Sequence, residues 1–140
     1  MKNPAARLRF WARLNGADVW TLLGWSLARL AGAQLKPLGG IWCATHGYVP
    51  SLLSHYPFGA VQAMVIGRVV FAADKAALRC HIRHEWAHVR QFCRFGLLFP
   101  LLYLLELLRQ LLRGESPYWH NIFEQEARRN EVRKMCARRN

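Results

Sequence analysis

The stretch HEWAHVRQ, residues 84–91, has two histidines four positions apart and a glutamate directly after the first. Residues four apart in an α-helix lie on one face, one turn above each other, so His84 and His88 can direct both imidazoles at one metal ion. Glu85 lies further round the helix, where its carboxylate can hold a water beside the ion and accept its proton. The spacing therefore predicts a zinc site with a general base next to it.

The residues before this stretch predict the element that carries it. Asp74 is a typical N-cap, and the helix is expected to run from Lys75 to about Phe95. Before the cap, AMVIGRVVFA (63–72) has β-branched residues on both sides of Gly67 and is the best strand candidate. An extended peptide substrate could pair with this strand, and Gly67 would permit its close approach.

A catalytic zinc site keeps three protein ligands and one open position, so a third ligand must come from elsewhere in the chain. The segment SPYWHNIFEQEARRNEVRKM (116–135) can start a helix at Asn121, with Glu124 and Glu126 near its beginning. Either glutamate could face the histidine pair. Asn121 with a glutamate three residues later is also the spacing of a capping box, in which the side chain returns to the backbone and binds no metal.

HEWAH followed by FEQEA resembles the gluzincin metallopeptidases, in which a second helix supplies a glutamate ligand. The sequence is most similar to compact bacterial members with His-Glu-x-x-His-x-x-Gln, a Tyr-containing apolar segment and Asn-Pro-Phe-Glu-x-Glu-Ala. The matching positions are His84, Glu85, His88, Gln91, Asn121, Phe123, Glu124, Glu126 and Ala127. Ile122 replaces the proline of that pattern, and Arg128 stands where many gluzincins place an aspartate that supports a ligand histidine.

The resemblance implies that Zn²⁺ is bound by His84, His88 and Glu124, and Glu126 is the alternative third ligand. It also implies hydrolysis of a peptide or protein substrate by a zinc-activated water, with Glu85 as the catalytic base. The protein would then be a metallopeptidase, which is a hydrolase.

Three further residues are candidates for supporting roles. Tyr118 and His120 lie just before the expected ligand helix, where a phenol or an imidazole could stabilise the oxyanion of a tetrahedral intermediate. Gln91 extends the face of the two histidines by about one turn and could support a ligand.

Length and composition fit one small domain over residues 1–140. A chain of 140 residues with 53% hydrophobic content is long enough for one core and too short for two ordinary domains. Residues 1–38 are expected to be a basic, amphipathic helical region, with Leu8, Trp11 and Leu14 on one face and a helix over 19–32 that KPLGG (36–40) ends. Residues 39–140 are expected to form a mainly helical, zincin-like α+β core, with a short sheet or hairpin packed on the His-Glu-x-x-His helix.

Charge and apolar patterning favour a membrane surface as the neighbour. The chain has 20 Lys and Arg against 8 Asp and Glu, a formal net charge of +12, and no recognisable nucleic-acid-binding fold. The apolar run from Phe95 to Gly114 approaches spanning length, but Pro100 and a polar stripe favour a core or interfacial helix. The stripe consists of Glu106, Arg109, Gln110 and Arg113.

Four cysteines without a close pair fit a reducing compartment, so we expect a cytoplasmic protein, peripheral at the inner membrane face. Two other interpretations stay open. The chain could be a non-catalytic interaction protein that keeps the zincin scaffold, or a membrane-associated basic protein whose histidine motif is accidental.

Overall fold

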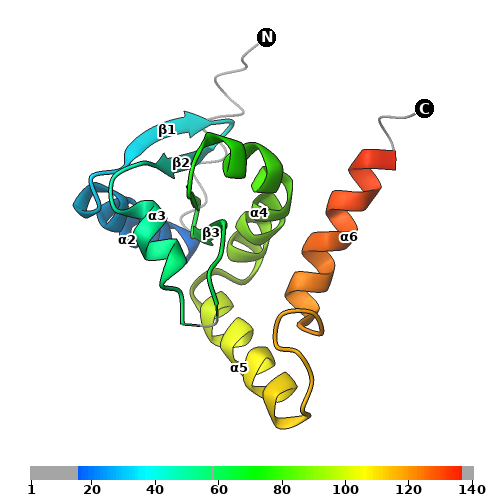
Figure 1. Ribbon diagram of the computed structural model, residues 1–140. Coiled ribbons are helices and arrows are strands. Elements are labelled where there is room, and N and C mark those ends of the chain that lie inside the picture. Colours follow the sequence, from blue (N-terminus) through cyan, green and yellow to red (C-terminus); the bar gives the residue numbers. More distant parts are fainter. Residues whose placement is uncertain (1–15, 58, 137–140) are drawn as a thin grey trace.

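The computed structural model describes residues 16–57 and 59–136 and has an α+β architecture (Figure 1). Its elements are α2 (Ala17–Leu30), β1 (Gln34–Leu38), β2 (Ile41–Thr45), α3 (Val49–Ser54), β3 (Ala63–Ile66), β4 (Val69–Ala72), α4 (Lys75–Phe95), the 3₁₀ helix η1 (Gly96–Leu98), α5 (Phe99–Leu112) and α6 (Ile122–Cys136). The predicted α+β class, with a sheet packed on the His-Glu-x-x-His helix, is confirmed. The amphipathic face predicted at Leu8, Trp11 and Leu14 lies outside the described residues.

The four strands form one mixed sheet in the order β1-β2-β4-β3. β2 and β4 pair in parallel, whereas β1 with β2 and β3 with β4 pair antiparallel. The segment 63–72 is therefore not the single strand that its sequence predicts but a hairpin, of which only β3 lies at a sheet edge. Residues 34–45 form a second hairpin that the sequence does not predict. Its turn is made by the two glycines of KPLGG, Gly39 and Gly40, with φ angles of 57° and 99°.

The predicted helices begin and end close to the expected residues. The sequence predicts a helix over 19–32, and α2 covers Ala17–Leu30. α4 runs from Lys75 to Phe95 as predicted, and Asp74 Oδ1 accepts a hydrogen bond from the amide of Ala77 at 2.7 Å. This cap satisfies one of the backbone donors that the first turn of a helix leaves without a partner.

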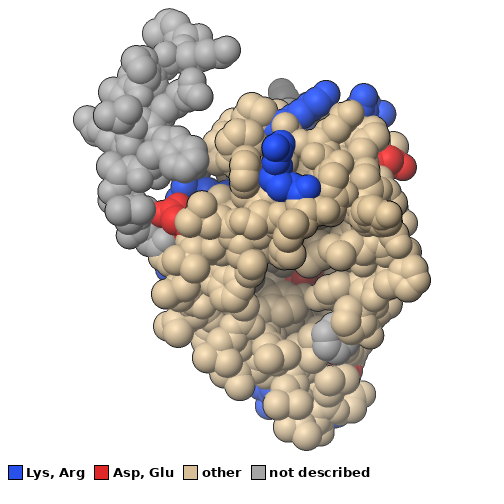
Figure 2. Space-filling model, turned by 90° about the vertical axis from the view of Figure 1, so that its left-hand side faces the viewer, with Lys and Arg blue, Asp and Glu red and all other residues tan. Residues whose placement is uncertain are grey.

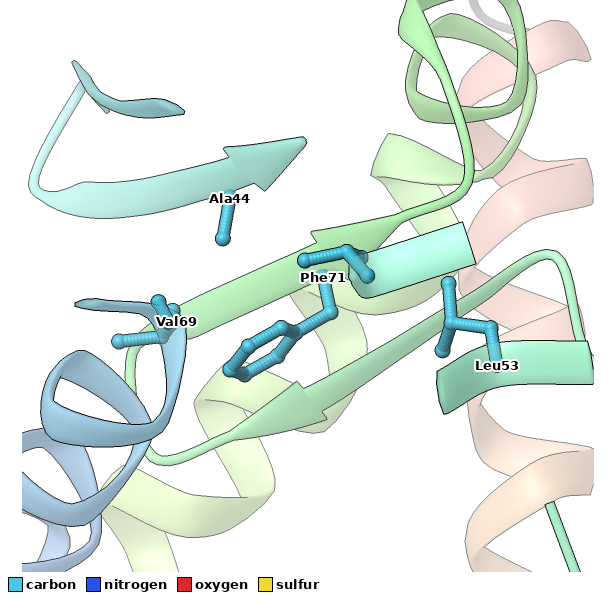
Figure 3. Close-up of a cluster of buried hydrophobic side chains, with 6 residues drawn as sticks. Ala44, Leu53, Val69 and Phe71 are labelled. Carbon is cyan, nitrogen blue, oxygen red and sulfur yellow. The ribbon is translucent and has the colours of Figure 1, made fainter. Parts of the chain in front are cut away.

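Helices cover both faces of the sheet, so β4 is buried throughout. Side chains alternate along the strand: Val69 and Phe71 face α2 and α3, whereas Val70 packs with Val89 of α4. Figure 3 shows the first of these clusters, which also contains Ala28, Ala44, Val49 and Leu53. α4 thus has one side on the sheet and its opposite side on α6 (Figure 1).

An aromatic cluster joins α4, α5 and the start of α6. Phe92 meets Phe99 edge-on with 4.6 Å between ring centroids, and Phe99 meets Phe123 edge-on at 5.3 Å. Tyr103 of α5 stacks on Phe123 at 6.1 Å. Aromatic pairs in such geometries contribute about 0.5–1.5 kcal/mol beyond the area that they bury. The cluster therefore holds the first turn of α6 against α4.

Glu106 makes a polar connection between α5 and α6. It is buried and accepts hydrogen bonds from Gln110 Nε2 at 2.6 Å and from Arg109 Nη1 at 3.0 Å. Burial opposes the charged carboxylate, but these donors and the backbone amide of Ile122 outweigh it and lower the pKa of Glu106. Part of the polar stripe predicted on α5 is thus turned inward, towards the start of α6.

One helical stretch among the described residues, Lys75–Leu112, is long and apolar enough to cross a membrane, judged by length and composition alone. The core helix of a soluble protein can have the same length and composition. α4 and α5 are separated within this stretch by η1 and point in different directions (Figure 1).

The turn between β3 and β4 lies against α2. Thr21 Oγ1 accepts a hydrogen bond from the amide of Arg68 at 3.0 Å and donates one to the carbonyl of Ala17 at 2.7 Å. Gly67 has a φ of 63°, and a Cβ at this position would overlap the backbone nitrogen of Thr21 and lie 2.6 Å from the carbonyl carbon of Trp20. Gly67 therefore permits the close approach of α2, and not that of a substrate strand.

Gly67→Ala is expected to lower the free energy of unfolding by about 3 kcal/mol or more, because backbone strain and overlap with α2 add together. Gly32→Ala is the matched control: Gly32 has a φ of 64° but has nothing within 4 Å of its Cβ position. Strain alone should cost this variant about 1–2 kcal/mol. Urea unfolding of both variants measures the difference, and equal losses would contradict the proposed contact with α2.

Candidate metal centre

α4 and α6 lie side by side and bring three buried metal-binding side chains together (Figure 1). His84 and His88 come from α4, and Glu124 comes from the first turn of α6. The two histidine Nε2 atoms are 3.1 Å apart. The two carboxylate oxygens of Glu124 lie 3.1 Å from Nε2 of His84 and 3.2 Å from Nε2 of His88. The ligand atoms of the three residues all lie within 4.8 Å of one another, so the group could hold a metal ion.

Gln91 determines which nitrogen of the neutral His88 carries the hydrogen. Its Nε2 donates to the carbonyl of Phe123 at 3.0 Å and to Glu126 Oε2 at 2.9 Å, and both partners are acceptors only. The amide oxygen of Gln91 therefore faces His88 and accepts a hydrogen bond from Nδ1 at 2.8 Å. The lone pair of His88 is left on Nε2, which points at the other two candidate ligands.

Glu124 directs its carboxylate to the histidines and not to the start of its own helix. Tyr103 donates a hydrogen bond to Glu124 Oε1 at 2.7 Å. The start of α6 is capped by Asn121, whose Oδ1 accepts a hydrogen bond from the amide of Phe123 at 2.9 Å. The geometry of Glu124 is therefore compatible with metal binding and differs from that of a capping-box glutamate.

The charges of Glu124 and His88 stabilise each other. Although burial opposes its charge, hydrogen bonds from His84, His88 and Tyr103 hold the pKa of Glu124 far below its ordinary value. Burial also opposes the imidazolium of His88, but the neighbouring Glu124 outweighs it and raises the pKa of His88. A metal ligand must be an unprotonated imidazole, so a proton and a metal ion compete for the same nitrogen.

Glu85 lies beside this group with a free carboxylate. It is only 5% exposed, and no side-chain hydrogen bond or ion pair joins its carboxylate to another residue in the described part of the chain. Burial raises the pKa of Glu85, and the charges of His88 and His84 oppose that effect. A buried carboxylate of raised basicity, without a protein partner, can bind and deprotonate a water.

The remaining predicted residues lie around the group at different distances. Glu126 is exposed and binds Gln91, so it is not one of the three clustered side chains. Burial and the charge of Glu124 raise the pKa of Tyr118, which places this phenol within electrostatic reach of the site. His120 is exposed, and no side-chain hydrogen bond or ion pair joins it to the cluster among the described residues.

Arg128 occupies the position at which many gluzincins have an aspartate, and it contacts the loop before α6. Its Nη2 donates to the carbonyl of Trp119 at 2.8 Å and, more weakly, to that of Tyr118 at 3.4 Å. The guanidinium also lies over both rings, 4.9 Å from the Trp119 centroid and 5.2 Å from that of Tyr118. Arg128 therefore positions Tyr118 and does not support a ligand.

The structure adds three residues that the sequence analysis did not assign to the site. Tyr103 binds Glu124 directly, and the pKa of Tyr56 is raised by burial and by the charge of Glu124. Glu131 Oε2 lies 3.9 Å from Nδ1 of His84. Glu131 follows Glu124 by seven residues, which places both on one face of α6, and this spacing is visible in the sequence.

The donor set fits a divalent metal ion. Imidazole nitrogen and carboxylate oxygen are ordinary zinc ligands, and three protein ligands leave a position open for water or substrate. Without a cation or a shared proton, two nitrogen lone pairs and a carboxylate would face one another in a buried space, where such repulsion is weakly screened. A metal ion held by His84, His88 and Glu124 would remove this repulsion.

Gln91→Ala is expected to lower zinc affinity by about 10–100-fold, because the variant loses the acceptor that directs the His88 lone pair to the metal. Gln125→Ala is the control, since Gln125 is in the same helix as Glu124, but no side-chain hydrogen bond or ion pair joins it to the candidate ligands among the described residues. Competition with a zinc chelator measures both affinities. An unchanged affinity in Gln91→Ala would refute the proposed role of the amide.

No protein-family model matches the chain, and no curated protein or solved structure matches it either. The functional interpretation therefore rests on the residues of this site and their geometry.

Proposed function

We propose that the protein is a zinc-dependent metallopeptidase of the gluzincin type. The observation that supports this most directly is the buried convergence of His84, His88 and Glu124, with the unpartnered Glu85 beside them. An accidental His-Glu-x-x-His pattern gives no reason for a glutamate of another helix to meet both imidazoles. The arrangement therefore favours a metal site over the alternative of a basic protein with a chance motif.

His84 and His88 would hold zinc through their Nε2 atoms, and Glu124 would hold it through its carboxylate. A bound zinc ion acts as a Lewis acid and lowers the pKa of a coordinated water to about 7. Glu85 would orient the attacking water, accept its proton as the oxygen adds to the peptide carbonyl, and return a proton to the leaving nitrogen. The C–N bond then breaks, and the products are a carboxylate and an amine.

Two tyrosines have distinct parts in this proposal. Tyr103 holds the Glu124 carboxylate in place through its 2.7 Å hydrogen bond. Tyr118 carries a phenol that is neutral at pH 7, and burial and the charge of Glu124 raise its pKa further; a neutral phenol can donate a hydrogen bond to the oxyanion of the intermediate. Arg128 would keep Tyr118 at the site by its contacts with residues 118–119.

The substrate in this proposal is an extended segment of a peptide or protein. β3 lies at an edge of the sheet and contacts α4, the helix that carries the histidines. Its four residues are all partly exposed, so an added strand could pair along it. Pairing along β3 would bring the substrate backbone alongside the zinc-binding helix.

Glu85→Gln is expected to keep zinc and to cleave peptides at least about 100-fold more slowly, because glutamine cannot accept the proton of the attacking water. The assay uses the zinc-loaded full chain with a mixture of peptides from a digested proteome, and mass spectrometry identifies the products. Glu115→Gln is the matched control, since it removes the same charge from an exposed position.

Equal cleavage by wild type and Glu85→Gln would show that Glu85 is not the base. Stoichiometric zinc in wild type without cleavage of any peptide would favour the non-catalytic scaffold instead. Loss of zinc in Glu85→Gln would assign this residue to metal binding and not to catalysis.

A further inference from the structure

α5 carries a continuous apolar face that no described element covers. Its outward-facing leucines are each about half exposed or more and recur at helical spacing; they are Leu101, Leu104, Leu105, Leu108, Leu111 and Leu112. The buried residues of the same helix, Phe99, Glu106, Leu107 and Gln110, lie on the opposite side. We call the six outward residues the leucine face.

This face is unlike that of a core helix. Only 22% of the most apolar part of the stretch Lys75–Leu112 is buried, whereas a core helix of a soluble protein is mostly buried. The stretch also lies far from the N-terminus, so a signal sequence does not account for it. Contiguous exposed apolar surface of this kind usually marks an interaction site.

The apolar surface continues from α5 onto α2. η1 contributes two further exposed leucines, Leu97 and Leu98. Trp20 Nε1 of α2 donates a hydrogen bond to the carbonyl of Leu97 in η1 at 3.3 Å. α2 therefore contacts η1, the segment that directly precedes α5. On α2, the exposed residues include Val19, Leu22, Leu23 and Trp25.

Figure 2 views the side of the molecule on which α2 lies, with α5 at its lower end. Lys and Arg side chains gather along the upper margin, and the broad middle and lower parts are almost free of charge. The same face is hollowed near its centre, and an acidic side chain is visible at the bottom of the hollow.

An exposed apolar face could bind a second copy of this chain or a lipid bilayer, and the net charge of the chain favours the bilayer. The chain has a formal net charge of +12, which opposes the association of two copies through one face. The same charge attracts an anionic bilayer, where basic residues beside an apolar surface strengthen binding. Arg109 lies on α5 itself, and Arg113 directly follows its last residue, Leu112.

We propose that the protein docks on an anionic lipid bilayer through the leucine face of α5, with the adjoining apolar residues of η1 and α2 at the same surface. α5 lies in the interface and does not span it, because Glu106, which accepts a hydrogen bond from Gln110, is tied to the start of α6 through the backbone amide of Ile122. This docking is independent of the proposed peptidase activity. If both hold, the substrate is a protein segment at the membrane surface.

The test measures binding of the full chain to vesicles by flotation, with phosphatidylcholine alone and with added phosphatidylglycerol. Wild type should bind the anionic vesicles more strongly, and Leu104→Glu should reduce its partitioning by about tenfold or more. Leu38→Glu is the matched control: it adds the same charge at β1, where the leucine is 48% exposed, compared with 54% for Leu104. This control should change partitioning by less than about threefold, the effect of one charge near an anionic surface.

Equal losses in Leu104→Glu and Leu38→Glu would overturn the proposal, because binding would then depend on charge alone. A wild-type dimer in the absence of vesicles that Leu104→Glu converts to monomer would identify a second copy as the occupant. Absence of binding to either vesicle would also contradict the proposal. Retained zinc binding and circular dichroism in Leu104→Glu exclude a folding defect, since Leu104 is 54% exposed and is not one of the candidate ligands.

Discussion

Two imidazole nitrogens and a carboxylate face one another in a buried space, and this arrangement constrains the rest of the structure. His84, His88 and Glu124 approach to 3.1–3.2 Å, a spacing that a buried group of acceptors tolerates only with a proton or a metal ion among them. Two of the three candidate ligands are held from behind by a neighbour: Gln91 binds His88, and Tyr103 binds Glu124. The chain thus holds together a buried donor set that could bind a metal ion.

Apolar packing holds α6 against α4 and thereby keeps these three side chains together. Phe123 enters the aromatic cluster of α4 and α5, and the next residue, Glu124, is thereby directed at the histidines. Glu106 adds a second connection through the amide of Ile122. α5 therefore has two different surfaces: the inner one packs towards the candidate metal ligand, and the outer one is exposed and is the surface that we propose docks on a bilayer.

The local parts of the site could be predicted from the sequence because they depend on helical spacing. His84 and His88 lie four residues apart on a helix whose N-cap, Asp74, can also be recognised from the sequence. Assigning Glu124 as a candidate ligand required the resemblance of FEQEA to gluzincins, because a glutamate in a capping box has the same spacing from Asn121. The sequence could not assign Tyr103 to the site, because its contact with Glu124 depends on how α5 packs against the rest of the chain.

The sheet was harder to predict because its turns depend on contacts distant in sequence. The two glycines of KPLGG resemble a helix end but close the β1–β2 hairpin. Gly67 breaks 63–72 into two strands because α2 packs on the turn.

The most direct test of the metal centre is the zinc content of purified wild type beside Glu124→Ala and Glu126→Ala. We predict one zinc per chain in wild type and in Glu126→Ala, and strongly reduced zinc in Glu124→Ala. Absence of zinc from wild type, or its full retention in Glu124→Ala, would contradict the account.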